Sequence, residues 1–337
     1  MKAGFCGITP DELSIILGGE STGERYAMKI VTNFYRRRIH DFQDMTNIQK
    51  SLRTYLSGKF VSGLSSPLKS ESSADMSVKY LFSCAGDRIH ESVYIPEKGR
   101  ITICVSTQSG CRMGCPFCVT GSMRFNGNLS AGEIVNQVIS TPGSEGVTHV
   151  VFMGMGEPLD NTDEVIKACR ILTAGWGLSL SPTHITVSTV GLTDGVRRFL
   201  NESDCNLTFS LLSPFSDERM SVVPAEKKWP SSEIIEMISA YPSPKKRRFT
   251  IGYLMMEGIN DSDRHLAELI KIVKGTGMRV NILPYHRVDG NGPFPSGQAR
   301  INLFRNILMQ SGISASVRRS RGGDISAACG MLAGKNK

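Results

Sequence analysis

The sequence contains no unbroken run of roughly eighteen apolar residues, which is the length that a membrane-crossing helix requires. A hydrophobic content of 40% in 337 residues is therefore expected to form a buried core. The sequence also lacks a secretory signal, and its nine cysteines are an ordinary density. We expect a cytoplasmic protein with no membrane partner, in which reduced thiols serve metals or redox chemistry instead of disulfides.

Acidic residues are outnumbered by basic ones, with 31 Asp and Glu against 39 Lys and Arg and a formal charge of +8. A basic soluble protein often binds nucleic acid, because cations that neutralise phosphates release counterions. Local basic runs favour the same interpretation, although a solvated surface is the alternative for each run. The runs are residues 36–38, 245–248, and 318–319 with Arg321.

Three cysteines form a C-x3-C-x2-C array directly after the apolar, strand-like run 101–105: Cys111, Cys115 and Cys118. Three thiolates can hold three irons of a [4Fe–4S] cube, whereas a fully ligated cube normally takes four cysteines. The fourth iron is then open to a ligand. The array therefore indicates a cluster that binds and reduces something, not one that only relays electrons.

Zinc is the alternative metal for the same array, with Cys104 as a fourth ligand. Structural zinc sites are usually built from two C-x2-C pairs brought together from separate places. The sequence has no second pair of this kind. The spacing therefore favours an iron–sulfur cluster over zinc.

The first part of the chain, residues 1–75, is predicted to form a small helical accessory domain. A helix start is expected at Thr9–Glu12, and further helices over 24–36 and 47–56. The serine-rich stretch 62–73 is predicted to be a linker or loop. After it we expect connecting strands over 76–100, the main domain over 101–318 and a C-terminal segment over 319–337.

From residue 101 onward, short apolar runs alternate with amphipathic helical stretches. Six such repeats predict an α/β fold with a parallel sheet, either doubly wound or a partial barrel. In both architectures the active site lies at the C-terminal ends of the strands. The expected strands are 101–106, 147–153, 184–189, 205–211, 248–254 and 278–284, and the expected helices are 130–140, 160–174, 192–201, 231–240, 261–274 and 299–311.

Candidate ligand contacts follow the other strands at the same expected edge. Gly156 and Glu157 follow the second strand, Ser188 ends the third, and Ser210 ends the fourth. Glycine lets the backbone approach a ligand, a carboxylate binds an ammonium group, and a hydroxyl bonds ribose or carboxylate. The alternative for these residues is ordinary turn and helix-cap chemistry.

Two further cysteines are notable for their positions. Cys104 lies on the first strand, seven residues before Cys111, and should project close to the same site. Cys329 lies in segment 321–330, which is rich in glycine and small residues. Such a segment is flexible enough to fold back over a site. A tolerated surface thiol is the alternative for Cys329.

These motifs together resemble the radical S-adenosylmethionine (SAM) RNA adenine methyltransferases of the RlmN/Cfr family. The resemblance extends over nearly the whole chain and implies a partial (βα)6 radical-SAM barrel with a small N-terminal helical RNA-binding domain. The residues that carry it are 104–111, the cysteine array, Gly121, 128–131, 152–158, the stretch 91–97 and the tail 321–330.

The resemblance implies a mechanism that uses two cysteines and two SAM molecules per turnover. Cys111, Cys115 and Cys118 would hold one [4Fe–4S] cluster, whose open iron takes SAM. One SAM would methylate Cys329, and a second would be cleaved to a radical that activates the methyl group for addition to adenine. Cys104 would then form a transient disulfide with Cys329, with Glu91 as the proton acceptor.

The implied substrate is an adenine carbon in structured RNA, most often C2 of adenine 2503 in 23S rRNA and also transfer RNA. C8 methylation, a paralogue with another RNA substrate and a non-catalytic zinc-binding RNA module are the alternatives. The other implied partner is an electron donor such as flavodoxin or ferredoxin, and the protein is expected to be a monomer.

The family's SAM-contacting positions fall on Gly156, Glu157, Ser188, Ser210, Leu211, Leu212 and His286 of this sequence. Two of them depart from the family pattern. Leu212 stands where histidine is usual and cannot make a side-chain hydrogen bond. His286 stands where asparagine is usual and can replace it as a donor.

Overall fold

The computed structural model describes residues 2–18, 21–84, 86–242, 246–287 and 292–333. Lys245 of one basic run and residues 334–337 of the expected C-terminal segment lie outside the described residues. No described helix has both the length and the apolar character needed to cross a membrane.

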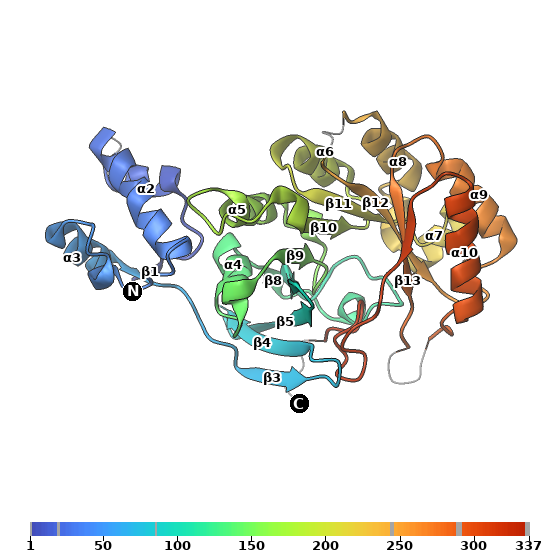
Figure 1. Cartoon of the computed structure of the whole chain (residues 1–337), viewed down its shortest axis with the longest axis horizontal. Helices are drawn as coiled ribbons and strands as arrows, with labels where there is room; N and C mark the ends of the chain where they lie inside the picture. The colour runs from blue at the N-terminus through green and yellow to red at the C-terminus, as the bar shows by residue number, and fades with distance from the viewer. Residues whose placement is uncertain (1, 19–20, 85, 243–245, 288–291, 334–337) are drawn as a thin grey trace.

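A ten-stranded sheet forms the larger lobe, in the order β14-β13-β12-β11-β10-β9-β6-β5-β4-β3 (Figure 1). The strands from β6 to β14 run parallel, and β3, β4 and β5 extend the sheet antiparallel. The sheet contains β3 (Lys69–Ser72), β4 (Val78–Cys84), β5 (Arg88–Glu97), β6 (Arg100–Val105), β9 (His149–Phe152), β10 (Ile185–Thr189), β11 (Asn206–Ser210), β12 (Phe249–Met255), β13 (Arg279–Pro284) and β14 (Ala315–Val317).

Helices alternate with the parallel strands, as the sequence predicts, and cover one face of the sheet. Ile185 and Val187 of β10 pack in the core with helical residues, whereas the alternate residues Thr186 and Ser188 line cavities on the opposite face. This alternation leaves a polar inner face for the site. The helices are α4 (Ala131–Ile139), α5 (Thr162–Thr173), α6 (Thr193–Glu202), α7 (Ser216–Val222), α8 (Ser231–Ala240), α9 (Asp263–Val273) and α10 (Gln298–Gln310).

All six expected strands and all six expected helices of the main domain are present, with ends that differ by at most two residues. The short helix α7 and the last strand β14 are additional elements that the sequence pattern does not predict. The predicted partial (βα)6 fold is therefore correct, and β14 extends its parallel sheet by one strand.

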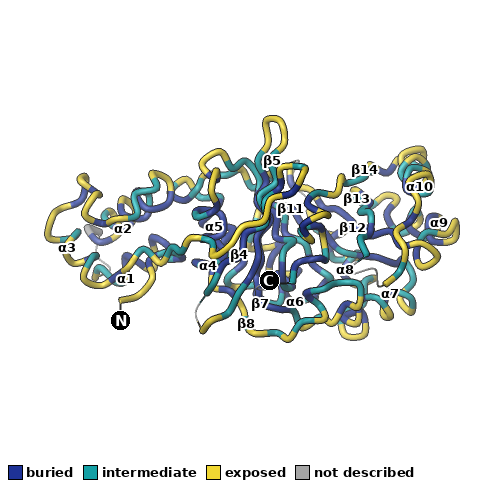
Figure 2. The backbone as a smooth tube through the Cα atoms, turned by 90° about the horizontal axis from the view of Figure 1, so that it is seen from below, coloured by how far each residue is buried: buried dark blue, intermediate teal, exposed yellow. Residues whose placement is uncertain are grey.

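The N-terminal lobe lies at one end of an elongated molecule (Figures 1 and 2). Thr9 caps its first helix in a capping box with Glu12, as the motif predicts. Phe5 packs at the centre of the lobe against aromatic rings of three other segments. The lobe contains β1 (Ala3–Gly4), α1 (Pro10–Ile16), α2 (Ser21–Tyr35), α3 (Lys50–Lys59) and β2 (Phe60–Val61).

The predicted boundary at residue 75 lies too late in the sequence. Residues 69–72 form β3, which pairs with β4 in the main sheet, so the N-terminal lobe ends before residue 69. β3 is an edge strand with all four residues exposed. It therefore has no apolar alternation, and its serines and charged residues resemble a linker.

Candidate active site

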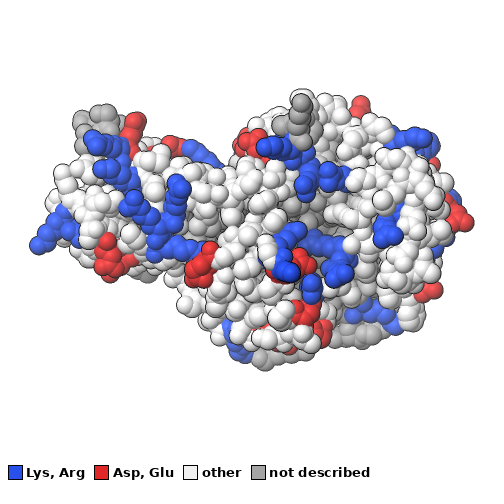
Figure 3. Space-filling view, viewed as in Figure 1, with Lys and Arg blue, Asp and Glu red and all other residues white. Residues whose placement is uncertain are grey.

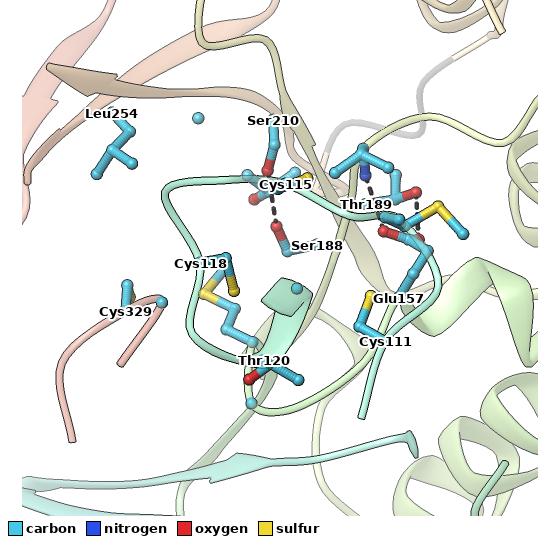
Figure 4. A pocket seen from close by; sticks show the side chains of 18 of the residues that line it. Cys111, Cys115, Cys118, Thr120, Glu157, Ser188, Thr189, Ser210, Leu254 and Cys329 are labelled. Atoms are coloured by element: carbon cyan, nitrogen blue, oxygen red, sulfur yellow. Dashed lines mark hydrogen bonds between the residues drawn. The ribbon is translucent and has the colours of Figure 1, made fainter. Parts of the chain in front are cut away.

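The cysteine array lies on a loop whose base is closed by two short strands. β7 (Gln108–Ser109) pairs antiparallel with β8 (Gly127–Asn128), so residues 110–126 follow the C-terminal end of β6. Gly114 has a φ of 67°, a left-handed conformation that glycine adopts easily and that turns the loop between the first two cysteines. Cys111, Cys115 and Cys118 line one cavity, as Figure 4 shows. Its volume is about 180 Å³.

The three thiols of this cluster cavity fit an iron–sulfur cluster. Burial raises their pKa values, that of Cys111 to about 12. A bare thiolate is costly there, and a bound cluster would supply the positive charge that stabilises it. Among the described residues, no three His, Cys, Asp or Glu side chains lie close enough to hold a single metal ion.

Glu157 reaches the wall of the cluster cavity, but its oxygens already accept hydrogen bonds. Oε1 accepts from Leu159 N–H at 3.0 Å and from the Thr189 hydroxyl at 2.6 Å, and Oε2 accepts from Val190 N–H at 3.0 Å. Burial raises the pKa of Glu157 to about 7. The carboxylate therefore ties the loop after β9 to the end of β10, and its contact with a cofactor stays a prediction.

Four other predicted cofactor contacts line the cluster cavity. The hydroxyls of Ser188 and Ser210 lie 3.4 Å apart on adjacent strands (Figure 4). Gly156 has a φ of 97°, and a Cβ there would lie 2.5 Å from the Gln108 side chain. Leu212 has a φ of 61°, which is strained for a residue with a Cβ, and it adds an apolar surface.

Two predicted contacts are not brought to the cluster cavity. The side chain of Leu211 is 1% exposed and packs in the main core, although its neighbours Ser210 and Leu212 line the cavity. His286 lines a second cavity instead, and burial lowers its pKa. Its Nε2 is buried without a hydrogen-bond partner among the described residues.

The two cysteines outside the array meet at this second cavity. Cys104 lies on β6 and is 8% exposed, and burial raises its pKa to about 12. Cys329 is exposed and lines both the second cavity and the cluster cavity. The structure therefore brings one thiol from β6 and one from the C-terminal segment to the same space.

Glu91 lies on β5 and contacts the segment that carries Cys329. Its Oε2 accepts a hydrogen bond from Ala333 N–H at 3.0 Å, and Lys79 Nζ lies 3.9 Å from Oε1. Lys79 also donates to the Ile325 carbonyl at 2.6 Å. Glu91 is 3% exposed and does not line either of the two cavities.

Several wall residues were missed from the sequence because they lie within strands instead of at strand ends. Thr208, Gly252 and Asn281 line the cluster cavity from β11, β12 and β13. The detectable signal is small or polar residues at alternate positions of successive strands. Leu207 and Phe209 on either side of Thr208 pack in the core.

Known proteins resemble this chain in sequence and in fold. The Radical SAM superfamily profile matches residues 105–270. The chain is 41% identical to a probable dual-specificity RNA methyltransferase RlmN from Parabacteroides distasonis, over 98% of this chain and 96% of that protein. The dual-specificity RNA methyltransferase RlmN of Geotalea uraniireducens is 36% identical over 99% of this chain and 97% of its own length. The chain belongs to the RlmN family.

A solved structure supports the same assignment for the fold. The crystal structure of a radical SAM methyltransferase from Sphaerobacter thermophilus matches with a TM-score of 0.89 and 35% identity, covering 99% of this chain and 100% of that one. RlmN family proteins are radical-SAM RNA methyltransferases, so this chain is an enzyme of that class. Membership implies a [4Fe–4S] cluster and SAM as cofactors, and it confirms the family predicted from the sequence.

Proposed function

We propose that this RlmN family member methylates an adenine carbon of structured RNA, with C2 of an adenine in 23S ribosomal RNA as its main target and transfer RNA as a second. Relatives named as dual-specificity RNA methyltransferases align over nearly the whole chain, which supports the substrate class. The observation that carries the proposal is the pair Cys104 and Cys329 at one cavity, outside the cluster array.

When bound, the cluster and SAM supply a methyl group and the radical chemistry that an unreactive aromatic carbon requires. Cys111, Cys115 and Cys118 would hold the cluster, and Gly156, Ser188 and Ser210 would line the SAM site. Because the methyl group and the radical each consume one SAM, we propose two per turnover. Flavodoxin or ferredoxin is the proposed class of electron donor.

Cys329 is the proposed methyl carrier, because its exposed sulfur borders both cavities. Once its methylene carbon is bonded to the base, the Cys104 thiolate would attack the Cys329 sulfur. The S–C bond breaks, its electron pair goes to the product carbon, which takes up the proton that Cys104 lost and becomes the methyl group, and an S–S bond forms. Earlier, as the adduct regains its aromatic ring, Glu91 would accept the proton that the base releases, and one electron would return to the redox centre that supplied it. Two electrons from the external donor and two protons from solvent would restore the thiols.

The remaining parts of the chain have proposed roles that follow from this chemistry. The N-terminal lobe is the proposed accessory RNA-binding domain, and the segment from residue 319 positions the methyl-carrying cysteine. We propose that the enzyme acts as a cytoplasmic monomer.

Two thiol variants test the proposed roles. Cys104→Ala should leave a covalent adduct between Cys329 and RNA, because the step that releases the product is lost. Cys329→Ala should give neither adduct nor product. Cys84→Ala is the control, since Cys84 lines neither of the two cavities, and it should retain activity. Methylated RNA from the Cys329→Ala protein would contradict the mechanism.

Two measurements separate the proposal from its alternatives. Mass mapping of RNA from cells that lack or overexpress the chain would give the substrate, the position and the methylated carbon. Methylation at C8 would contradict C2 as the target carbon. Anaerobic purification should yield a brown protein with about four irons and four sulfides per chain. Zinc in place of iron would contradict it and favour a non-catalytic RNA-binding module.

A further inference from the structure

The second cavity extends from the two thiols to the end of the parallel sheet where its strands begin. It has a volume of about 520 Å³, against about 180 Å³ for the cluster cavity. Cys104 and Cys329 line one part of it. Arg100, Arg248 and Arg279 line another part, and each stands at or next to the first residue of its strand. These are the N-terminal ends of the strands, whereas the cluster loop follows the C-terminal end of β6.

The charge around this cavity is strongly positive and almost uncompensated. Six arginines and one glutamate line it, a net charge of +5 with neutral histidines. The glutamate, Glu97, is already paired with Arg321 at 3.3 Å. Within the described part of the chain, none of the other five guanidiniums forms an ion pair: Arg100, Arg248, Arg279, Arg318 and Arg319.

These cations are close enough to repel one another. The pKa of Arg100 is lowered by burial and also by the charges of Arg318 and Arg248, against an opposing effect of Glu97. Burial lowers the pKa of His149 in the cavity wall to about 4, together with the charges of Arg100, His184 and Arg248. Like charges gathered without counter-charges destabilise the free protein, and an anionic ligand would relieve that repulsion.

Other arginines of the same basic runs serve the fold instead. Arg247 is buried and donates to the carbonyls of Phe199, Leu200 and Cys205, whereas its neighbour Arg248 is exposed at the cavity. Arg38 of the first run donates to the Ile139 carbonyl and to Ser144. The arginines that line the cavity without an ion pair thus differ from those that bond to the protein's own backbone. Figure 3 shows Lys and Arg around a hollow in this face.

The wall of the second cavity also carries uncharged polar side chains from neighbouring strands. Hydroxyl and amide groups on adjacent strands face the space and can bond ribose or base edges. The residues are Thr102, Thr186, Asn206, Thr208, Thr250 and Asn281.

We propose that these guanidiniums bind the phosphodiester backbone beside the target adenine, so that the RNA enters from the edge of the sheet where the parallel strands begin, opposite the cluster loop. The proposal rests on the proposed function for the identity of the polyanion. The cations are spread over β6, β12, β13 and the chain after β14, which suits an extended backbone better than one small anion. Arg248 and Arg279 are positioning residues for the RNA, not participants in the chemistry.

The double variant Arg248→Gln/Arg279→Gln in the cluster-loaded enzyme tests this. Each phosphate contact on single-stranded RNA contributes about 0.7 to the slope of log affinity against log salt, so the slope should fall by about 1.4. RNA affinity and kcat/KM should fall about tenfold near physiological salt. Arg248→Lys/Arg279→Lys should restore the slope, and Arg197→Gln/Arg305→Gln, on α6 and α10 away from the cavity, should leave it unchanged.

An unchanged slope in the glutamine variant would overturn the proposal, as would a lysine variant as weak as the glutamine one. Methylation of Cys329 by SAM without RNA, read by peptide mass, should be equal in all these proteins. Loss of that reaction in the parent enzyme would refute the proposed chemistry, not the RNA path. Parent enzyme that methylates Cys329 but binds no RNA would overturn both the substrate and the path.

Discussion

The guanidinium of Arg219 is fully buried and holds the ends of two adjacent strands beside the cluster cavity. It donates to the carbonyls of Val190, Ser210 and Leu211, and its charge is paired with Glu226, which is also buried. Arg219 stands on α7, the helix that the sequence pattern did not predict. One side chain thus fixes the backbone around two predicted cofactor contacts.

We expect Arg219→Met to lower the free energy of unfolding by about 3–5 kcal/mol, because Glu226 becomes an unpaired buried charge. The double variant Arg219→Met/Glu226→Gln should recover part of that loss. Urea titration of both proteins measures it. The control Arg198→Met removes an exposed arginine and should change stability little. A loss as small as that of the control would show that the buried pair does not support the fold.

His90 gives the protein a predicted sensitivity to acid. Its ring is 1% exposed, stacks on Phe82 and has no hydrogen-bond partner for either nitrogen among the described residues. Burial lowers its pKa from an ordinary 6.5 to about 4. The unfolded chain therefore takes up a proton near pH 6.5 that the folded protein refuses until about pH 4.

This contribution to stability is complete above pH 6.5 and is lost as the pH falls towards 4. At about 1.4 kcal/mol per pH unit, the loss over that range is about 3 kcal/mol. His90→Phe keeps an aromatic ring beside Phe82 and should flatten the pH profile of unfolding by this amount. Identical profiles for the parent and the variant would show that His90 does not couple stability to pH.

At the scale of elements, the sequence predicts the βα units well because each buried strand and each amphipathic helix has its own apolar period. Three elements lack that signal. β3 has four exposed residues, β14 has three residues with none fully buried, and α7 is a single seven-residue helix around the buried Arg219. Pairing and packing with distant parts of the chain determine these elements, and a local pattern does not encode them.

The C-terminal segment is held at both ends while Cys329 between them stays exposed. On one side, Asp324 accepts hydrogen bonds from the Ser73 hydroxyl at 2.6 Å and from Ala74 N–H at 3.0 Å. On the other side, Val119 N–H donates to the Gly330 carbonyl at 2.8 Å. The position of the Cys329 thiol is thus set jointly by the hairpin of β3 and β4 and by the cluster loop.

Asp324→Ala should release the first of these attachments and make Cys329 more mobile. We expect the alkylation rate of Cys329 by iodoacetamide, followed by peptide mass, to rise several-fold, and RNA methylation to fall. Ser73→Ala removes only one of the two bonds to Asp324 and should give an intermediate rate. Equal alkylation rates in the parent and both variants would mean that Asp324 does not hold the segment.

At the scale of the whole molecule, the sequence predicted the cluster cysteines better than the arginine-lined cavity beside them. The array of Cys111, Cys115 and Cys118 is contiguous, so its spacing alone indicates the cluster. Arg100, Arg248 and Arg279 are far apart in the sequence, and only the parallel sheet brings them to one cavity. Arg247 is buried and its neighbour Arg248 is exposed, a difference that counting charges along the sequence cannot detect.

The N-terminal lobe is fixed against the barrel by a close contact of two backbones. A Cβ on Gly132, in the first turn of α4, would lie 2.2 Å from the carbonyl oxygen of Cys6. Lys167 and Glu12 form an ion pair across the same junction at 2.6 Å. These two contacts hold the lobe against the barrel at α4 and α5.

Gly132→Ala should push the N-terminal lobe away from α4, because the added Cβ meets backbone that cannot move aside alone. Overpacking of this kind costs about 1–3 kcal/mol, more than alanine gains in a helix. We expect a lower melting temperature and a larger radius of gyration in X-ray scattering, with cluster content unchanged. Gly58→Ala in α3, where a Cβ meets nothing within 4 Å, should instead stabilise the protein by about 0.5–1 kcal/mol. If both variants were stabilised alike, the two backbones would not be in contact in solution.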